Sequence, residues 1–309
     1  MAKAKIVVRR PPSSIKYQPS AITIIIPAYN EAQSIAPVLA GLKSWRSRAE
    51  VIVVDDASKD NTAEIAEKSG VRIIRHMHNN GYGAALKTGI RAASGDIAVL
   101  MDADSEHSAA QIQSLLDAMG DNDMVVGARG KNSPTVFLRR PGKWLLGKVA
   151  NYLAQTEIPD LNSGFRAVRT RVAKLFLHIL PNGFSFTTTL TLALFKEGYN
   201  TAYVPIVTKP RVGSSTVHPI RDGINTIMLI IRVIALFDPL KVFVPTSALL
   251  FLVGAVYWIA SIFYRLSQRN DPALHIPSGA VIVLVSSVII FMFGILADQV
   301  SAIRREKYE

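Results

Sequence analysis

Two aspartates, Asp102 and Asp104, stand two residues apart directly after the apolar run 97–101. Such a run is typical of a buried strand, and the carboxyl end of a parallel strand faces the crevice in which open α/β sheets bind ligands. Carboxylate oxygens are the ligands that Mg²⁺ and Mn²⁺ prefer, and such an ion can bridge a diphosphate. The pair therefore predicts a metal site beside a phosphorylated ligand, although Asp-x-Asp is also common in turns.

Two other apolar runs end in residues that could contact a nucleotide. The run 22–26 leads directly into Pro27, Ala28, Tyr29, Asn30 and Glu31. Proline and asparagine favour a turn here, and the Tyr29 ring offers a flat face for stacking on a base or ribose. The run 51–54 leads into Asp55 and Asp56, and one of these carboxylates could accept the imide N–H of a uracil.

A glycine-rich loop and a lysine follow the next run, 71–75. The loop Asn79-Asn80-Gly81-Tyr82-Gly83 contains two glycines, at which a ligand could approach the backbone closely. Lys87, further along, could reach a phosphate, but a solvated helix lysine fits the pattern equally well. Because the carboxyl ends of parallel strands meet at one edge of a sheet, these segments and Asp102-Ala103-Asp104 predict a single nucleotide-binding crevice.

The segments between these residues alternate between strand and helix. Short runs rich in β-branched residues predict strands at residues 22–26, 51–54, 71–75, 96–101 and 124–127. The segments between and after them predict helices at residues 34–45, 60–68, 84–93 and 109–119. This alternation predicts an α/β fold built on a mostly parallel sheet with helices on both faces.

The composition limits the classes of function. Lys and Arg total 35 against 23 for Asp and Glu, and the resulting net charge of +12 suits anionic partners such as phosphorylated substrates or acidic lipid headgroups. Nucleic acid is not predicted as a partner, because no nucleic-acid-binding module accompanies the charge. The chain has no cysteine, which excludes disulfides, thiolate catalysis and cysteine-ligated metal centres.

Two C-terminal segments predict a membrane anchor. Residues 242–264 and 276–296 are uncharged and apolar, and each is long enough to cross roughly 30 Å of hydrocarbon as a helix. Lys241 precedes the first segment and Arg304, Arg305 and Lys307 follow the second, against Arg265 and Arg269 in the link. Positive charge favours the cytoplasmic side, so a multi-pass protein with both termini and the N-terminal domain in the cytoplasm is predicted.

The remaining boundaries follow from these assignments. Residues 1–20 are predicted to form a basic tail without the apolar core of a secretory signal, and residues 21–218 are predicted to form the cytoplasmic α/β domain. Residues 219–237 carry apolar side chains at helical spacing and predict an amphipathic helix at the membrane surface, with a helix packed on the domain as the alternative. Residues 297–309 form a second basic tail.

Six stretches of the chain resemble one enzyme family. They are 26–31 (IPAYNE), 54–60 (VDDASKD), 81–87 (GYGAALK), 101–104 (MDAD), 160–166 (DLNSGFR) and 211–216 (RVGSST). As a set they resemble the inverting glycosyltransferases of family two with the GT-A, Rossmann-like fold. Within that family the chain is most similar to the polyprenyl-phosphate glycosyltransferases, relatives of dolichol-phosphate mannose synthase and of bactoprenol glucosyltransferases. The resemblance covers about the first 220 residues, and paired C-terminal spans also occur among bacterial members.

The resemblance implies roles for the acidic residues. The donor is a nucleotide-sugar, and Asp102 and Asp104 lie around its metal–diphosphate. Glu106 stands where relatives often carry a glutamine that touches the metal. His107 is expected at the surface, with a position near the metal site as the alternative. Asp160 stands at the position whose residue, in many relatives, deprotonates the acceptor hydroxyl. A phosphate acceptor is already mostly ionised, since its second pKa is about 6, so Asp160 could instead orient the sugar or an arginine such as Arg166.

The resemblance also implies roles for basic residues around a polyprenyl-phosphate acceptor. Guanidinium groups suit phosphate oxygens. The candidate acceptor or phosphate ligands are Arg129, Arg139, Arg140, Arg211 and Ser214. A solvated basic loop is an equally good interpretation of Arg139 and Arg140.

Together these points predict inverting transfer of a hexose, from UDP-glucose in the first instance, to a polyprenyl phosphate at the inner face of the cytoplasmic membrane. The alternatives are GDP-mannose as the donor, a different acceptor, and a non-catalytic nucleotide-binding scaffold. A processive polysaccharide synthase is not favoured, because the Gln-x-x-Arg-Trp motif of those relatives is absent. The resemblance also implies a homo-oligomer, with a tetramer as one option.

Overall fold

The computed structural model describes residues 22–130, 147–148, 151–152, 157–183, 185–208, 228–229, 231, 238–267 and 276–306. The chain divides into two units, Met1–Ile227 and Met228–Glu309.

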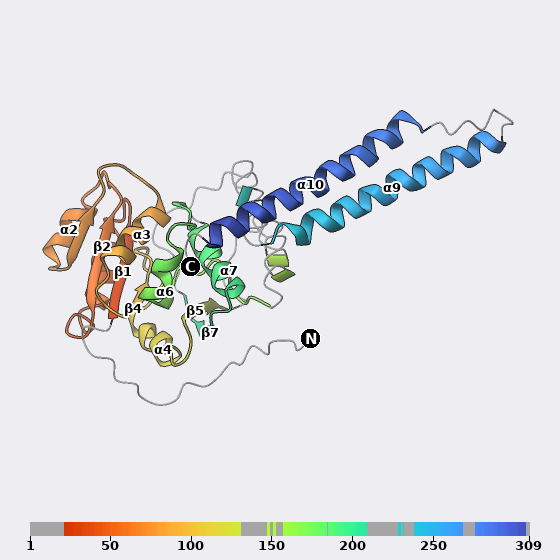
Figure 1. Ribbon diagram of the computed structural model, residues 1–309. Helices are drawn as coiled ribbons and strands as arrows, with labels where there is room; N and C mark the ends of the chain where they lie inside the picture. The colour runs from red at the N-terminus through yellow and green to blue at the C-terminus, as the bar shows by residue number, and fades with distance from the viewer. Residues whose placement is uncertain are drawn as a thin grey trace. The chain divides into compact units, whose positions relative to one another are not determined.

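The described part of the first unit is built on a seven-stranded sheet (Figure 1). The strands are β1 (Ile22–Ala28), β2 (Glu50–Asp55), β3 (Arg72–Arg75), β4 (Ile97–Leu100), β5 (Met124–Arg129), β6 (Arg166–Arg169) and β7 (Thr201–Ile206). Their order across the sheet is β3-β2-β1-β4-β6-β5-β7. The pairs formed by β3, β2, β1 and β4 are parallel, β6 is antiparallel to β4 and β5, and β7 is parallel to β5.

The central strands are buried on both faces by helices. On one face Ile24 and Ile26 of β1 pack with apolar residues of α1 (Ile35–Gly41) and α4 (Ile112–Asp117). On the other face Ile52 and Val54 of β2 pack with Ala85 of α3 (Tyr82–Ala92). Successive strand residues point to opposite faces, so continuous apolar strands require cover on both sides. The predicted α/β fold with helices on both faces is therefore confirmed.

All five predicted strands are present, but β6 and β7 were not predicted. β6 matters for the site because it runs antiparallel to β4, with Arg166 opposite Leu100. The loop that precedes an antiparallel strand lies at the carboxyl end of its neighbour. The segment 157–165 is therefore brought to the edge where Asp102 and Asp104 follow β4.

The helices differ from the predicted ranges at their ends. The helix predicted at 34–45 ends at Gly41 and is followed by turns, and the helix predicted at 60–68 is α2 (Thr62–Lys68). The segment predicted as one helix at 109–119 begins with a 3₁₀ turn before α4. The helix predicted at 84–93 begins at Tyr82, directly after Gly81, whose φ of 98° favours glycine. Two further helices, α6 (Thr170–Phe176) and α7 (Phe186–Lys196), follow β6.

The described part of the second unit contains two long apolar helices, α9 (Leu240–Ser267) and α10 (Ser278–Glu306) (Figure 1). They pack against each other, and Gly254 allows the close approach because a Cβ there would lie 2.9 Å from a carbon of Leu284. Both are long and apolar enough to cross a membrane, with mean hydropathies of 2.0 and 2.9. The predicted amphipathic helix at 219–237 falls outside the described residues except for 228–229 and 231.

Candidate active site

A cavity of about 390 Å³ opens at the carboxyl ends of the parallel strands, and we call it the strand-end cavity. Its size is in the range typical of small-molecule sites. Its lining residues come from four strand ends, α3, the segment before β6, and α7. They are Pro27, Ala28, Tyr29, Glu31, Asp56, Asn79, Gly81, Tyr82, Ala85, Asp102, Ala103, Asp104, Asn162, Gly164 and Thr187. The structure thus brings together most of the predicted nucleotide-sugar residues.

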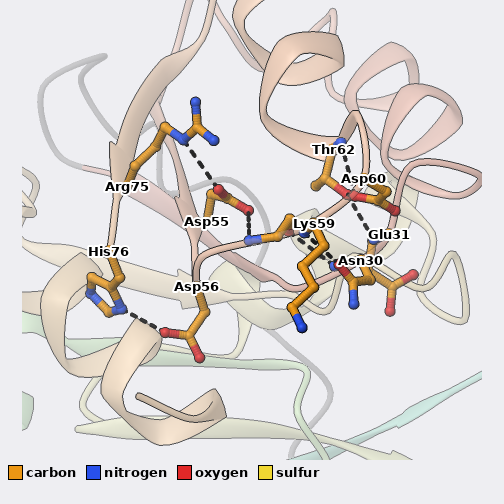
Figure 2. A network of polar contacts seen from close by, with 10 residues as sticks. Asn30, Glu31, Asp55, Asp56, Lys59, Asp60, Thr62, Arg75 and His76 are labelled. Atoms are coloured by element: carbon orange, nitrogen blue, oxygen red, sulfur yellow. Dashed lines mark hydrogen bonds and ion pairs between the residues drawn. The ribbon is translucent and has the colours of Figure 1, made fainter. Parts of the chain in front are cut away.

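The loop that carries Tyr29 and Glu31 is held by the loop after β2 (Figure 2). The backbone N–H of Glu31 donates to Thr62 Oγ1 at 2.8 Å, and that of Ala32 donates to Asp60 Oδ2 at 3.1 Å. In return the backbone N–H of Lys59 donates to Asn30 Oδ1 at 2.8 Å. These reciprocal bonds fix Asn30 at a φ of 55°, a conformation that asparagine tolerates better than most residues. These bonds therefore hold the loop after β1, which lines the cavity, against the loop after β2.

Asp55 and Asp56 point in different directions (Figure 2). Asp55 is fully buried, forms an ion pair with Arg75 at 3.3 Å and does not line the cavity. Asp56 does line it. Its Oδ1 accepts from His76 Nδ1 at 2.7 Å and from the Asn80 N–H at 2.9 Å, and its Oδ2 accepts from the Gly81 N–H at 2.7 Å. Of the two carboxylates, Asp56 is the one placed to meet a ligand.

The glycines after β3 pack against a neighbouring loop. A Cβ on Gly83 would lie 2.3 Å from the Pro181 carbonyl oxygen, and one on Gly81 would lie 2.6 Å from that of Asn182. The predicted close approach therefore involves protein backbone at both positions, although Gly81 also lines the cavity. Lys87 does not line the strand-end cavity. Its amine instead donates to the Leu180 carbonyl at 3.0 Å. Burial, together with the charge of Arg91, lowers the pKa of Lys87.

Asp102 is held from two sides. The Tyr82 hydroxyl donates to Asp102 Oδ1 at 2.7 Å. Asp102 Oδ2 lies against Gly164, where a Cβ would be only 2.2 Å away, so only glycine leaves room for this carboxylate. Burial and then the charge of Asp102 raise the pKa of Tyr82 well above its usual value, and its hydroxyl remains a donor. Tyr82 had no role in the sequence prediction, because nothing in its spacing relates it to Asp102.

His107 is buried, which contradicts the expected surface position. It is 6% exposed and stacks on Phe165 with ring centroids 5.0 Å apart. Its Nδ1 lies 4.0 Å from Asp102 Oδ2. Phe165 is fully buried and belongs to the segment before β6, so the His107 imidazole that stacks on it is buried as well. This segment was not predicted to lie next to β4, and the burial of His107 could not be foreseen without it.

The donor set of the cavity fits a divalent cation. Asp102 and Asp104 both line it, and Asp104 Oδ1 accepts from the Glu106 backbone N–H at 3.1 Å. Burial and then the negative charge of Asp104 raise the pKa of Glu106, which does not line the cavity. Among the described residues no group of three or more histidines and carboxylates is placed to hold a metal ion alone. Two carboxylates suit an ion such as Mg²⁺ that completes its shell with phosphate oxygens and water.

Asp160 forms a two-pronged ion pair with Arg129 beside the cavity. Arg129 Nε donates to Asp160 Oδ2 at 2.7 Å and Nη2 donates to Oδ1 at 3.0 Å. The Asn162 backbone N–H also donates to Oδ1 at 3.1 Å. Burial raises the pKa of Asp160, but the hydrogen bonds and charge of Arg129 outweigh it, so the net shift is downward. Asp160 thus orients Arg129 rather than Arg166.

Arg166 joins the segment before β6 to α7 through hydrogen bonds of its guanidinium group. Its side chain is fully buried and donates to the Ser163 carbonyl at 3.1 Å, the Thr187 carbonyl at 3.1 Å and Thr191 Oγ1 at 3.0 Å. These bonds tie the segment to α7, and Thr188 Oγ1 adds a bond to Asn162 Oδ1 at 2.8 Å. The sequence prediction gave no role to Asn162, Gly164 or Thr187 on the cavity wall. Asn162 and Gly164 lie within the family-like stretch 160–166, whereas Thr187 belongs to α7, a helix that was not predicted.

Four predicted residues cannot be placed. Arg139, Arg140, Arg211 and Ser214 lie outside the described residues.

Comparison with known proteins identifies the family. Residues 23–176 match the family model of glycosyl transferase family 2, and residues 238–303 match that of the GtrB C-terminal hairpin. The chain is 27% identical over 298 residues to glycosyltransferase AglJ of Haloferax volcanii, covering 94% of this chain and 96% of that protein. It is 32% identical over 206 residues to the dolichyl-phosphate hexose transferase of the same organism (65% and 89% covered). It is 30% identical over 201 residues to the undecaprenyl-phosphate mannosyltransferase of Micrococcus luteus (60% and 82% covered).

The fold also resembles that of solved structures. One is glucosyl-3-phosphoglycerate synthase from Mycobacterium tuberculosis in complex with Mn²⁺, UDP and glucosyl-3-phosphoglycerate, at 22% identity and a TM-score of 0.55. The match covers 70% of this chain and 79% of that structure. This likeness supports the fold, while the sequence matches establish descent. The chain belongs to glycosyl transferase family 2 and carries a hairpin of the GtrB C-terminal type.

Proposed function

We propose that the protein transfers a hexose from a nucleotide-sugar to the phosphate of a polyprenyl phosphate, with inversion at the anomeric carbon. The observation that carries this proposal is the pair Asp102 and Asp104 on the wall of the strand-end cavity, in a chain of family 2 that also has a hairpin of two apolar helices. The names of the Haloferax volcanii and Micrococcus luteus relatives support the lipid-phosphate acceptor.

The donor is UDP-glucose in this proposal. In this proposal the Tyr29 ring stacks on the base or ribose and Asp56 accepts an N–H of the base, since both residues line the same cavity as Asp102 and Asp104. GDP-mannose remains the second candidate donor, since the Micrococcus luteus relative is named a mannosyltransferase.

The residues at the carboxyl end of β4 would hold the diphosphate through a divalent cation. Asp102 and Asp104 are its proposed ligands, Glu106 is a third candidate from its sequence position, and a bound Mg²⁺ or Mn²⁺ would offset the charge of the departing nucleoside diphosphate. The structure with Mn²⁺ and UDP in the mycobacterial synthase supports this choice. Tyr82 and Gly164 keep the Asp102 carboxylate in one orientation, so little reorganisation accompanies binding.

The acceptor is activated by its own charge. A phosphate monoester is mostly ionised at neutral pH, because its second pKa is about 6, so its oxygen can attack the anomeric carbon without a general base. The oxygens of Asp160 are occupied by Arg129 and the Asn162 N–H, which leaves Asp160 as a positioning residue. Arg129 is placed by Asp160 to attract the acceptor phosphate, a role also proposed for Arg139, Arg140, Arg211 and Ser214.

The hairpin would keep this reaction at the membrane. We place the catalytic domain and both termini in the cytoplasm, and we expect a homo-oligomer. Holding the cavity near the headgroups confines the search for the lipid to a surface, which favours encounter through positioning. A non-catalytic scaffold is disfavoured, because both aspartates and the orientation of Asp102 are intact.

The test is transfer of labelled sugar from UDP-glucose to undecaprenyl phosphate in detergent. We expect label in the lipid with Mg²⁺ or Mn²⁺, none with EDTA, and none with Asp104→Asn. The control Asp121→Asn changes an exposed aspartate that does not line the cavity and should leave transfer unchanged. Failure of a panel of UDP- and GDP-sugars to label the lipid, with sugar released to water or to another acceptor, would refute the polyprenyl-phosphate acceptor.

A further inference from the structure

His76 is a partly buried partner of Asp56, a carboxylate on the wall of the strand-end cavity. It lies directly after β3 with a side chain 12% exposed. Its Nδ1 faces Asp56 Oδ1 at 2.7 Å, and its Nε2 faces Thr88 Oγ1 of α3 at 2.9 Å (Figure 2 shows the first contact). Because a carboxylate only accepts, Nδ1 carries the proton toward Asp56.

The hydrogen bonds of Asp56 leave it one open acceptor position. A carboxylate has two oxygens, each able to accept about two hydrogen bonds. Oδ1 is filled by His76 Nδ1 and the Asn80 N–H, whereas within the described part of the chain Oδ2 accepts only the Gly81 N–H. The remaining position on Oδ2 is available to a ligand in the cavity that Asp56 lines.

One open acceptor suits one class of base. Uracil presents a single imide N–H between two carbonyl oxygens, so one acceptor satisfies it. Guanine presents two adjacent donors, the ring N–H and the exocyclic amine, and pairs with a carboxylate through both oxygens. When Oδ1 is already filled, the second guanine donor would enter the cavity without a partner, which is costly in a desolvated site.

We propose that His76, by occupying Oδ1 of Asp56, makes the cavity select a base with one N–H donor over a base with two. The inference rests on the proposed nucleotide-sugar donor and adds the residue that chooses between the uridine and guanosine classes. His76 is a positioning residue, since it acts through Asp56. Thr88 completes the arrangement by holding the far side of the imidazole.

The experiment measures the dissociation constants of UDP and GDP for the full-length protein in detergent with Mn²⁺ by calorimetry. Wild type should prefer UDP by about tenfold or more, the value expected for one unsatisfied buried donor. His76→Leu should reduce this ratio to roughly threefold or less, because Oδ1 becomes free. His76→Asn places an amide N–H near the position of Nδ1 and should keep the wild-type ratio.

One control variant and the way the two constants change separate selection from a structural role. His78→Leu changes an exposed histidine two residues away and should alter neither constant. If His76→Leu weakens UDP and GDP by the same factor, or if wild type binds GDP as tightly as UDP, the inference is wrong while the nucleotide site stands. If wild type binds neither nucleotide, the proposed donor class fails as well.

Discussion

Asp160 shows how its hydrogen-bond partners change the role expected of a residue. Family resemblance suggests a base, yet both of its oxygens accept hydrogen bonds from Arg129. A general base must have an oxygen free to take a proton, and its pKa should lie near the working pH. The net downward shift of the Asp160 pKa moves it further from that range.

Replacing Asp160 with Asn therefore tests positioning against base catalysis. We expect Asp160→Asn to raise the KM for polyprenyl phosphate roughly tenfold, because Arg129 loses a charge-assisted two-pronged partner. The shape of the kcat–pH profile near neutrality should stay unchanged, since Asp160 is ionised there and titrates only below its ordinary pKa of 3.8. Loss of kcat by about 10²-fold or more, together with loss of the acid limb of the profile, would instead identify a base.

The Tyr82 hydroxyl offers a second test on the metal side. Tyr82→Phe removes the 2.7 Å hydrogen bond that the Tyr82 hydroxyl of α3 donates to Asp102 Oδ1. A hydrogen bond to a charged group contributes about 1.5–3 kcal/mol, so half-saturation with Mn²⁺ should require roughly tenfold more metal. The measurements are activity against Mn²⁺ concentration and Mn²⁺ binding in the presence of UDP.

Tyr29→Phe is the matched control for Tyr82→Phe. It also removes a tyrosine hydroxyl from the cavity wall but keeps the ring proposed to stack on the donor. Its Mn²⁺ dependence should match that of wild type. Equal effects of the two substitutions would show that Tyr82 does not act through Asp102.

At the scale of elements, the sequence predicted strands β1 to β5 and missed β6, which is antiparallel to both of its neighbours, and β7. Strands β1, β2 and β4 are nearly continuous runs of apolar residues, because helices cover both faces, and such runs are easily recognised. β6 is only four residues long and has arginine at both ends, and β7 contains Pro205. Neither resembles a buried strand, yet β6 carries the segment that places Gly164 and Asn162 in the cavity.

The sequence also did not show which of Asp55 and Asp56 lines the cavity. They are adjacent at the end of β2, and residue type alone does not distinguish them. Their side chains diverge because Asp55 is the last strand residue and meets Arg75 at the end of β3, whereas Asp56 lies beyond the ladder and turns to His76. Strand pairing decides the outcome, and the β2–β3 register is a long-range feature that spacing within one segment does not encode.

The contact between α3 and the loop after α6 gives a prediction about packing. Gly83→Ala would place a Cβ 2.3 Å from the Pro181 carbonyl oxygen, so backbone must move. Overpacking of this kind costs about 1–3 kcal/mol, and the unfolding midpoint should fall accordingly. Gly183→Ala is the matched control on the facing loop, because a Cβ there meets nothing within 4 Å. The midpoint of thermal unfolding should be lower for Gly83→Ala than for Gly183→Ala. Equal midpoints would contradict the close contact at Gly83.

The hydrogen bonds that join the loop after β1 to the loop after β2 give a prediction about donor binding. Asp60→Ala removes the acceptor of the Ala32 and Thr62 backbone N–H groups. Loss of a hydrogen bond to a charged acceptor costs about 1.5–3 kcal/mol, and the released loop carries Tyr29 and Glu31. We expect a modest loss of stability and a several-fold higher KM for the nucleotide-sugar, with kcat less affected. Glu67→Ala, an exposed residue of α2, should change neither, and an unchanged KM for Asp60→Ala would show that these hydrogen bonds do not support the donor site.

At the scale of the whole molecule, the second unit is shaped for a non-aqueous environment. Large apolar side chains of α9 and α10 are exposed along the helices, including Phe251, Tyr257, Ile282 and Phe293. A soluble protein rarely exposes a continuous apolar surface of this extent, because each such side chain gains free energy when it leaves water. A helix of 28 residues is about 42 Å long, which exceeds the roughly 30 Å of hydrocarbon, so α9 can cross with its ends in the headgroup layers.

The sidedness of the hairpin can be tested because the chain has no cysteine. More basic residues flank the hairpin than lie in its link, which favours a cytoplasmic domain and an external link. Lys68→Cys, on the exposed surface of α2, should react with a membrane-impermeant maleimide only after the cells are opened. Asn270→Cys, between the two apolar segments, should react in intact cells. The reverse pattern would place the strand-end cavity on the outer side, where cytoplasmic nucleotide-sugars do not reach it, and would refute both the topology and the proposed donor together.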